Sequence, residues 1–140
     1  MFLKKINLKN FRNYSDEEFV FQKNKTLFTG KNAQGKTNLL EAVYYLSSLD
    51  SERIKKDSEL IKFDETETKI SGVILKDDVD IELDIIISLL KNKILKVNGL
   101  KKNKHKEFLR VLSCVKFSSQ DLLLLRGEPQ NRRKWLDLAI

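Results

Sequence analysis

Alternating apolar and polar positions predict that a large part of this chain forms β-strands. The clearest alternation covers residues 79–89, where aliphatic side chains at the odd positions are separated by three acidic residues. A period of two is typical of a strand with one face buried and the other in water. Residues 69–75 and 93–97 carry similar patterns, and Asn98-Gly99 favours a tight turn. Together these segments predict an antiparallel meander.

Other patterns predict elements on both sides of the meander. They indicate an opening strand over residues 2–8 and short strands around Phe19 and Phe21 and over Thr26–Thr29. The period then changes to that of a helix over residues 36–48, because apolar residues at i, i+1, i+4, i+7 and i+10 share one face. Shorter runs predict helices around 58–62, 103–113, 120–125 and 131–140, and a buried strand at Val115–Phe117.

The composition is typical of a soluble protein with one domain. The chain has 140 residues, of which 41% are hydrophobic and 34% charged. Apolar runs such as Leu122–Leu125 fall far short of the ~20 residues that a membrane span needs. The single cysteine, Cys114, excludes an internal disulfide, and its apolar neighbours predict an inert core position. With no signal segment at its start, the sequence predicts a cytoplasmic protein.

Positive charge gives the first indication of a partner. Lys and Arg number 27 against 20 Asp and Glu, which leaves a net charge of +7 and favours polyanions such as nucleic acid. Lysines spread over a solvated surface are the alternative. The densest basic run, Lys101–Lys106 with His105, leaves the same two interpretations open. Without interleaved aromatic residues to stack on bases, a solvated turn and helix start is favoured there.

One motif in the sequence predicts a specific chemical function. It matches G-x-x-x-x-G-K-[ST] in full and consists of Gly30, Lys31, Asn32, Ala33, Gln34, Gly35, Lys36 and Thr37. The two glycines allow a backbone in which successive N–H groups point inward around an anion. Lys36 supplies a charge for the β- and γ-phosphates, and the Thr37 hydroxyl is a ligand for Mg²⁺. The sequence therefore predicts a site for a nucleoside triphosphate with Mg²⁺.

The loop alone does not identify the class of protein, because kinases, GTPases, helicases and ATPases share it. The segments around the loop narrow the choice. The chain reads KKINLKNFRNY before the loop, TNLLEAVY after its GK, and DSELIKF further on. Near the end it reads FSSQDL, GEP and RRKWLD. In this order the segments resemble the RecF family of bacterial recombination-repair proteins, relatives of the SMC ATPases. A long meander after the loop helix speaks against a small-molecule kinase.

The resemblance implies an α/β (mixed α+β) fold, the N-terminal lobe of an ABC-ATPase head with an inserted antiparallel meander. It implies ATP and Mg²⁺ as cofactors, with Arg12 and Asn13 near the nucleotide. Gln120 falls in the segment that corresponds to the Q-loop, where a polar side chain senses Mg²⁺ and the γ-phosphate. Relatives usually carry Pro-Glu where this chain has Ser119-Gln120.

The resemblance also implies partners. Proteins of this family dimerise head to tail around two ATP molecules and bind DNA near single-strand gaps, without sequence preference. There they cooperate with RecR and RecO to place RecA on the exposed strand. Asp50 and Glu52 are acidic where relatives tend to be basic.

Two elements of the family's hydrolysis machinery are absent from the 140 residues. The aliphatic run Leu122–Leu125 is followed by Arg126 and not by the acidic pair of a Walker B segment, and there is no Leu-Ser-x-Gly-Gln signature. We therefore expect residues 1–140 to be a truncated N-terminal lobe with no catalytic residue and no turnover of its own. A fragment that binds nucleotide for a regulatory purpose is the alternative to a repair ATPase.

Overall fold

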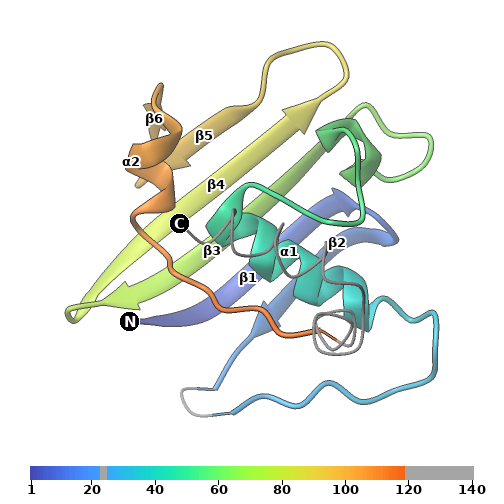
Figure 1. Ribbon diagram of the computed structural model, residues 1–140, viewed down its shortest axis with the longest axis horizontal. Helices are drawn as coiled ribbons and strands as arrows, with labels where there is room; N and C mark the ends of the chain where they lie inside the picture. Colours follow the sequence, from blue (N-terminus) through green and yellow to red (C-terminus); the bar gives the residue numbers. More distant parts are fainter. Residues whose placement is uncertain (23–24, 119–140) are drawn as a thin grey trace, which may run out of the picture.

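The fold was examined in a computed structural model, which describes residues 1–22 and 25–118. Within these ranges, six strands form one antiparallel sheet in the order β2-β1-β3-β4-β5-β6, and a helix lies across one of its faces (Figure 1). The elements are β1 (Phe2–Phe11), β2 (Tyr14–Val20), α1 (Lys36–Ser48), η1 (Asp57–Leu60), β3 (Glu67–Lys76), β4 (Val79–Ser88), β5 (Ile94–Val97), β6 (Leu100–Lys102) and α2 (His105–Leu109).

The core lies between the sheet and α1. Alternate residues of β1, β3 and β4 point to the side of the sheet that carries α1. The side chains that form this core are fully or almost fully buried: Ile6, Leu8, Ile70, Ile74, Leu83 and Ile85 from the sheet, and Leu39, Ala42, Tyr45 and Leu46 from α1. Burying one such aliphatic side chain contributes about 1.5–3 kcal/mol. The predicted meander is confirmed, because β3, β4 and β5 pair antiparallel in sequence order.

Gly72 of β3 marks a close approach between the sheet and α1. A Cβ at this position would overlap Cδ2 of Leu46 and lie 3.4 Å from Cδ1 of Leu3. The absence of a side chain at Gly72 therefore allows α1 to pack directly on the sheet.

The segment that follows α1 returns to the end of β1. The backbone N–H of Arg12 donates to the carbonyl of Leu60, and the N–H of Lys62 donates to the carbonyl of Asn10, both at 2.8 Å. Near η1, Lys93 forms an ion pair with Asp57 at 2.8 Å and donates to the hydroxyl of Tyr45 at 3.3 Å. Residues 57–62 are thus fixed to the end of β1 and, through Lys93, to Tyr45 of α1.

Several predicted elements differ from the structure. Thr26–Thr29 is not a strand, because none of the described strands pairs with it. Val115–Phe117 is neither a strand nor buried, since Val115 is 97% and Phe117 76% exposed. Cys114 is likewise exposed, so the prediction of a core position was wrong. The predicted helix over 103–113 is reduced to α2, although Phe108 and Leu112 are buried as expected. The predicted helices at 120–125 and 131–140 lie outside the described residues.

Candidate functional site

The loop before α1 requires glycine at both fixed positions. Gly30 has φ 148° and Gly35 has φ 98°, in a region that favours residues without a side chain. A Cβ on Gly30 would lie 2.7 Å from Oε1 of Gln34, and one on Gly35 would lie 2.7 Å from Nδ2 of Asn13. Local conformation and close contacts therefore both explain the spacing of the glycines.

Lys36, the first residue of α1, folds back over this loop. Its Nζ donates to the carbonyl oxygens of Gly30 at 2.7 Å and Lys31 at 2.5 Å. An ammonium has three donors, so one remains for an anionic ligand. The charge stands at the N-terminus of a 13-residue helix, whose partial positive charge also favours anions.

A cavity of about 270 Å³ opens beside the loop. One of its lining residues, Arg53, belongs to none of the sequence motifs. Its lining consists of Asn32, Ala33, Gly35, Lys36, Thr37, Asn38 and Arg53. We call this cavity the phosphate pocket. Arg53 lies within the charged stretch 50–68, which the sequence indicates only as a surface connection, and no spacing pattern ties it to Lys36. Among the residues that the structure describes, the pocket thus combines two cations and has no carboxylate in its lining.

A second cavity, of about 400 Å³, adjoins the first and shares Thr37 and Arg53 with it. Its remaining lining comes mainly from α1 and from residues 114–118, including Tyr44, Val115 and Phe117. Lys116 lies over the ring of Tyr44, 5.2 Å from its centroid. The Thr37 side chain therefore stands between a polar and a largely apolar cavity.

The β1–β2 turn contacts the start of α1 through two successive residues. Oδ1 of Asn13 accepts from Nδ2 of Asn38 at 2.7 Å, and the hydroxyl of Tyr14 donates to the carbonyl of Gly35 at 2.9 Å. Burial, and to a smaller degree the charge of Glu17, raises the pKa of Tyr14, so this hydroxyl keeps its proton. Asn13 and Tyr14 thereby fix the start of α1, where the glycine loop ends.

Arg12 is placed differently from Asn13. Its guanidinium does not line the phosphate pocket but forks onto Glu41 of α1, with Nε 3.1 Å from Oε2 and Nη2 2.8 Å from Oε1. Glu41 also accepts from Nη1 of Arg53 at 2.8 Å and from Oγ of Ser51 at 2.6 Å. Gln120 lies outside the described residues.

Glu41 is a buried charge with a full set of partners, since its side chain is only 3% exposed. Burial acts to raise its pKa, but hydrogen bonds from Arg12 and Ser51 and the charges of Arg12 and Arg53 outweigh that effect. The net result is a pKa below the ordinary value of a glutamate, so this carboxylate is ionised at neutral pH.

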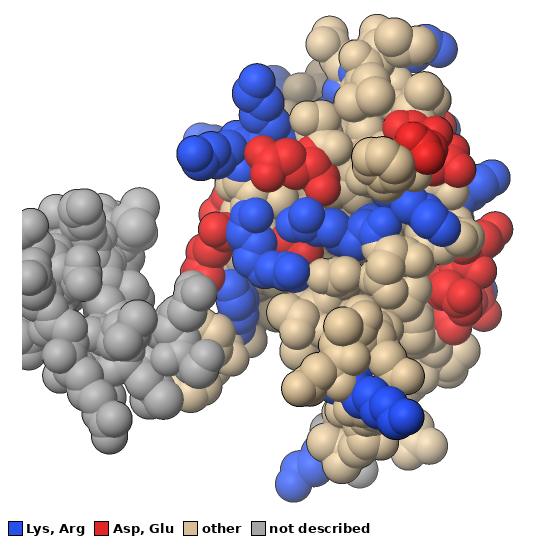
Figure 2. Space-filling model, turned by 90° about the vertical axis from the view of Figure 1, so that its right-hand side faces the viewer, with Lys and Arg blue, Asp and Glu red and all other residues tan. Residues whose placement is uncertain are grey.

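Basic side chains also form a band on one face of the molecule. Figure 2 shows Lys and Arg side chains in a band across the face that carries the β1–β2 turn, with acidic side chains on either side. The run from Lys101 to Lys106 lies at β6 and the start of α2, where His105 is exposed as predicted. Lys102 approaches Glu107 at 3.8 Å.

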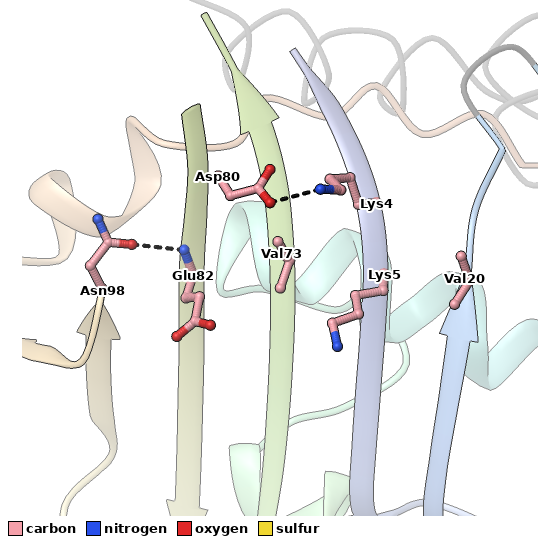
Figure 3. Close-up of a pocket in the computed structure, with 7 residues that line it drawn as sticks. All are labelled: Lys4, Lys5, Val20, Val73, Asp80, Glu82 and Asn98. Atoms are coloured by element: carbon pink, nitrogen blue, oxygen red, sulfur yellow. Dashed lines mark hydrogen bonds and ion pairs between the residues drawn. The ribbon is translucent and has the colours of Figure 1, made fainter. Parts of the chain in front are cut away.

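A larger cavity, of about 550 Å³, lies on the sheet face away from α1 (Figure 3). Both lysines in its lining have a carboxylate partner. Lys4 bonds Asp80 at 2.7 Å, and Lys5 bonds Glu18 at 3.0 Å. Such cross-strand pairs are typical of a solvated sheet face.

Over the described ranges, no helix is long and apolar enough to cross a membrane.

The sheet, the glycine loop and the helix that starts at Lys36 define the P-loop NTPase fold. The AAA ATPase domain family matches residues 1–130, and the chain belongs to this family. Over its whole length it is 41% identical to the DNA replication and repair protein RecF of Streptococcus gordonii and 44% identical to that of Natranaerobius thermophilus. The chain spans 37–38% of the length of these two relatives.

Solved structures agree with the sequence comparison. A structure of the recombination mediator protein RecF with ATP, in the RecFOR pathway, superposes with a TM-score of 0.85 at 39% identity, over 97% of this chain and 37% of that chain. An SMC ATPase structure superposes with a TM-score of 0.82 at 18% identity and 98% coverage of both chains, which shows the fold alone. The predicted fold class and the resemblance to RecF are both confirmed.

Proposed function

We propose that this chain binds the phosphates of ATP, together with Mg²⁺, in the loop Gly30–Thr37. The observation that carries the proposal is the phosphate pocket, where Lys36, Arg53 and the N-terminus of α1 converge and where no carboxylate of residues 1–22 or 25–118 lines the cavity. A polyanion is the ligand that this charge distribution favours.

The residues present fit a nucleotide with a magnesium ion. The positive φ values of Gly30 and Gly35 suit a backbone that curves around a phosphate. Thr37, whose hydroxyl would be a magnesium ligand, lines the pocket. When bound, Mg²⁺ would neutralise part of the charge of the phosphates. Gln120 would be its second protein contact, and Asn13 would hold the helix end beside the nucleotide.

We further propose that the protein acts in DNA repair as RecF does. Its relatives are named for replication and repair, and one solved relative is a recombination mediator in the RecFOR pathway. In this role residues 1–140 form the nucleotide-binding lobe of a cytoplasmic protein that dimerises with ATP. The dimer binds single-stranded and gapped DNA and cooperates with RecO and RecR in loading RecA. The net charge of +7 supports a nucleic-acid partner.

Calorimetric titration with Mg·ATP tests the phosphate site. We expect Lys36→Ala to weaken binding by about 1.5–3 kcal/mol, the range of a hydrogen bond to a charged group. Lys25→Ala, which removes the same charge upstream of the loop, is the matched control and should leave the affinity unchanged. Equal affinity for ATP in the parent and in Lys36→Ala would disprove the assignment.

A further inference from the structure

We propose that Ser51 is a positioning residue, whose hydroxyl keeps the guanidinium of Arg53 directed into the phosphate pocket. This inference rests on the proposed function, because it concerns the same nucleotide site. Ser51 is not part of the phosphate pocket but lines the adjoining cavity of about 400 Å³. Its effect on a bound phosphate is therefore exerted through Arg53.

The first support is that the Ser51 hydroxyl is buried and acts as both donor and acceptor. Ser51 is only 6% exposed. Its Oγ donates to Oε1 of Glu41 at 2.6 Å and accepts from the backbone N–H of Arg53 at 3.2 Å. A hydroxyl that accepts from the N–H two residues later forms a local turn typical of Ser and Thr. One hydroxyl thus joins the backbone of Arg53 to a carboxylate of α1.

The second support is that Arg53 is held at both of its ends by the same pair of residues. Its backbone N–H bonds Ser51, and its Nη1 donates to Oε2 of Glu41 at 2.8 Å. Ser51 in turn bonds the other oxygen of that carboxylate, whose side chain is 3% exposed. This closed ring of hydrogen bonds removes rotamer freedom that a long Arg side chain otherwise has. The guanidinium is therefore placed before a ligand arrives, which lowers the entropic cost of binding.

The third support is the set of donors that this arrangement leaves for a ligand. Nη1 of Arg53 also donates to Oδ1 of Asn38 at 2.9 Å, so both of its N–H groups are used. Across residues 1–22 and 25–118, the guanidinium bonds through Nη1 only. Of its five N–H donors, the two on Nη2 and the one on Nε remain. The side chain is 44% exposed and lines the phosphate pocket, so these donors can serve a phosphate.

A double-mutant cycle in nucleotide affinity tests whether Ser51 acts through Arg53. Ser51→Ala, Arg53→Gln and the double variant are compared with the parent protein by competition of ATP and AMP against a fluorescent ATP analogue. Thermal unfolding of each variant shows that the protein is folded. Ser47→Ala is the matched control. Ser47 is 9% exposed, bonds the carbonyl of Tyr44 and lines neither of the two cavities.

We expect Ser51→Ala to weaken the binding of ATP about fivefold, well below the ~100-fold that a misplacement of about 1 Å can cost. The loss should be larger for ATP than for AMP, because the misplaced charge faces the phosphate chain. In the background of Arg53→Gln, the same change at Ser51 should alter the affinity for ATP by less than about twofold, because the group that it positions is absent. Ser47→Ala should bind both nucleotides as the parent does.

An equal loss in both backgrounds would overturn the proposal, because Ser51 would then act without Arg53. An equal loss for ATP and AMP, or an unchanged affinity for ATP in Ser51→Ala, would overturn it as well. If Ser51→Ala does not fold, Ser51→Cys takes its place, because a thiol is only a weak donor and acceptor, and the same comparisons decide. If the parent binds no ATP, the proposed function itself fails, which is a different outcome from any result of the cycle.

Discussion

The two cations of the phosphate pocket are held by different kinds of contact. Lys36 is tied only to backbone carbonyls of its own loop, so its flexible stem can follow a ligand. The planar guanidinium of Arg53 is held by Asn38 and Glu41 and keeps a fixed direction. We therefore expect Lys36 to adapt to the nucleotide and Arg53 to select for its phosphate chain.

This difference predicts the behaviour of Arg53→Gln. We expect the variant to bind ATP about tenfold more weakly, at the lower end of the range for a charged hydrogen bond because the side chain is partly exposed. Because the lost charge faces phosphates, the loss should be larger for ATP than for AMP. Competition titrations with ATP, ADP and AMP measure it, with Lys55→Gln as a control for the same charge. An equal loss for all three nucleotides would contradict a phosphate contact.

Glu41 makes stability depend on pH in the acidic range. Because its pKa is lowered in the folded protein, its stabilisation is present above the ordinary glutamate pKa of about 4.3. It is lost as the pH falls from there through the folded value, because the unfolded chain then binds more protons. We expect Glu41→Gln to make the free energy of unfolding less steep below about pH 5, by up to ~1.4 kcal/mol per pH unit. Urea unfolding at a series of pH values measures the slope, and parallel curves would contradict the expectation.

At the level of residues, the sequence motif predicted the whole glycine loop but gave no indication of the ion-pair cluster of Arg12, Glu41 and Arg53. The fixed spacing from Gly30 to Thr37 carries its own chemistry, whereas Arg12, Glu41 and Arg53 are far apart in the chain. Only folding brings them together, through the pairing of the end of β1 with residues 60–62. An ordinary Glu at a helical position gives no signal of such a role.

At the level of elements, hydrophobic periodicity correctly predicted those segments in which the spacing of apolar residues determines which face is buried. The helix over 36–48 and the strand from Val79 formed as the 3.6 and 2.0 periods indicated. Thr26–Thr29 and Val115–Phe117 have β-rich compositions, but among the described residues no neighbouring strand pairs with them. Strand formation depends on such a partner, which local composition cannot supply.

The contact between α1 and β3 gives a prediction about packing. We expect Gly72→Ala to destabilise the protein by about 1–3 kcal/mol, the usual cost of overpacking, because the new methyl group would overlap Leu46. In Leu46→Ala the space is already open, so adding Gly72→Ala should cost little or restore stability. Urea denaturation of the two single variants and the double variant measures this coupling. Additive losses would show that the two positions do not meet.

At the level of the whole molecule, charge is unevenly distributed along the order of strands. The edge strand β2 exposes Asp16, Glu17 and Glu18. At the opposite edge, Lys101 and Lys104 are exposed and make no ion pair within the described part of the chain. Since β2 and β6 are the two ends of the sheet, a polyanion is attracted to the β6 edge and repelled from the β2 edge.

This asymmetry leads to a prediction for the proposed binding of DNA. We expect binding to be independent of sequence, because phosphate contacts carry no sequence information, and to weaken about a hundredfold from 50 to 200 mM salt if about four phosphates are neutralised. Replacing Lys101 and Lys104 together by Gln should reduce the salt dependence by about two units of slope. Replacing Lys4 and Lys5 by Gln removes the same charge, but both already pair with carboxylates, so the slope should change little. Fluorescence anisotropy with shuffled duplexes at several salt concentrations measures both slopes. A preference for one sequence, or equal slopes for the two double variants, would show that the β6 edge is not where DNA is held.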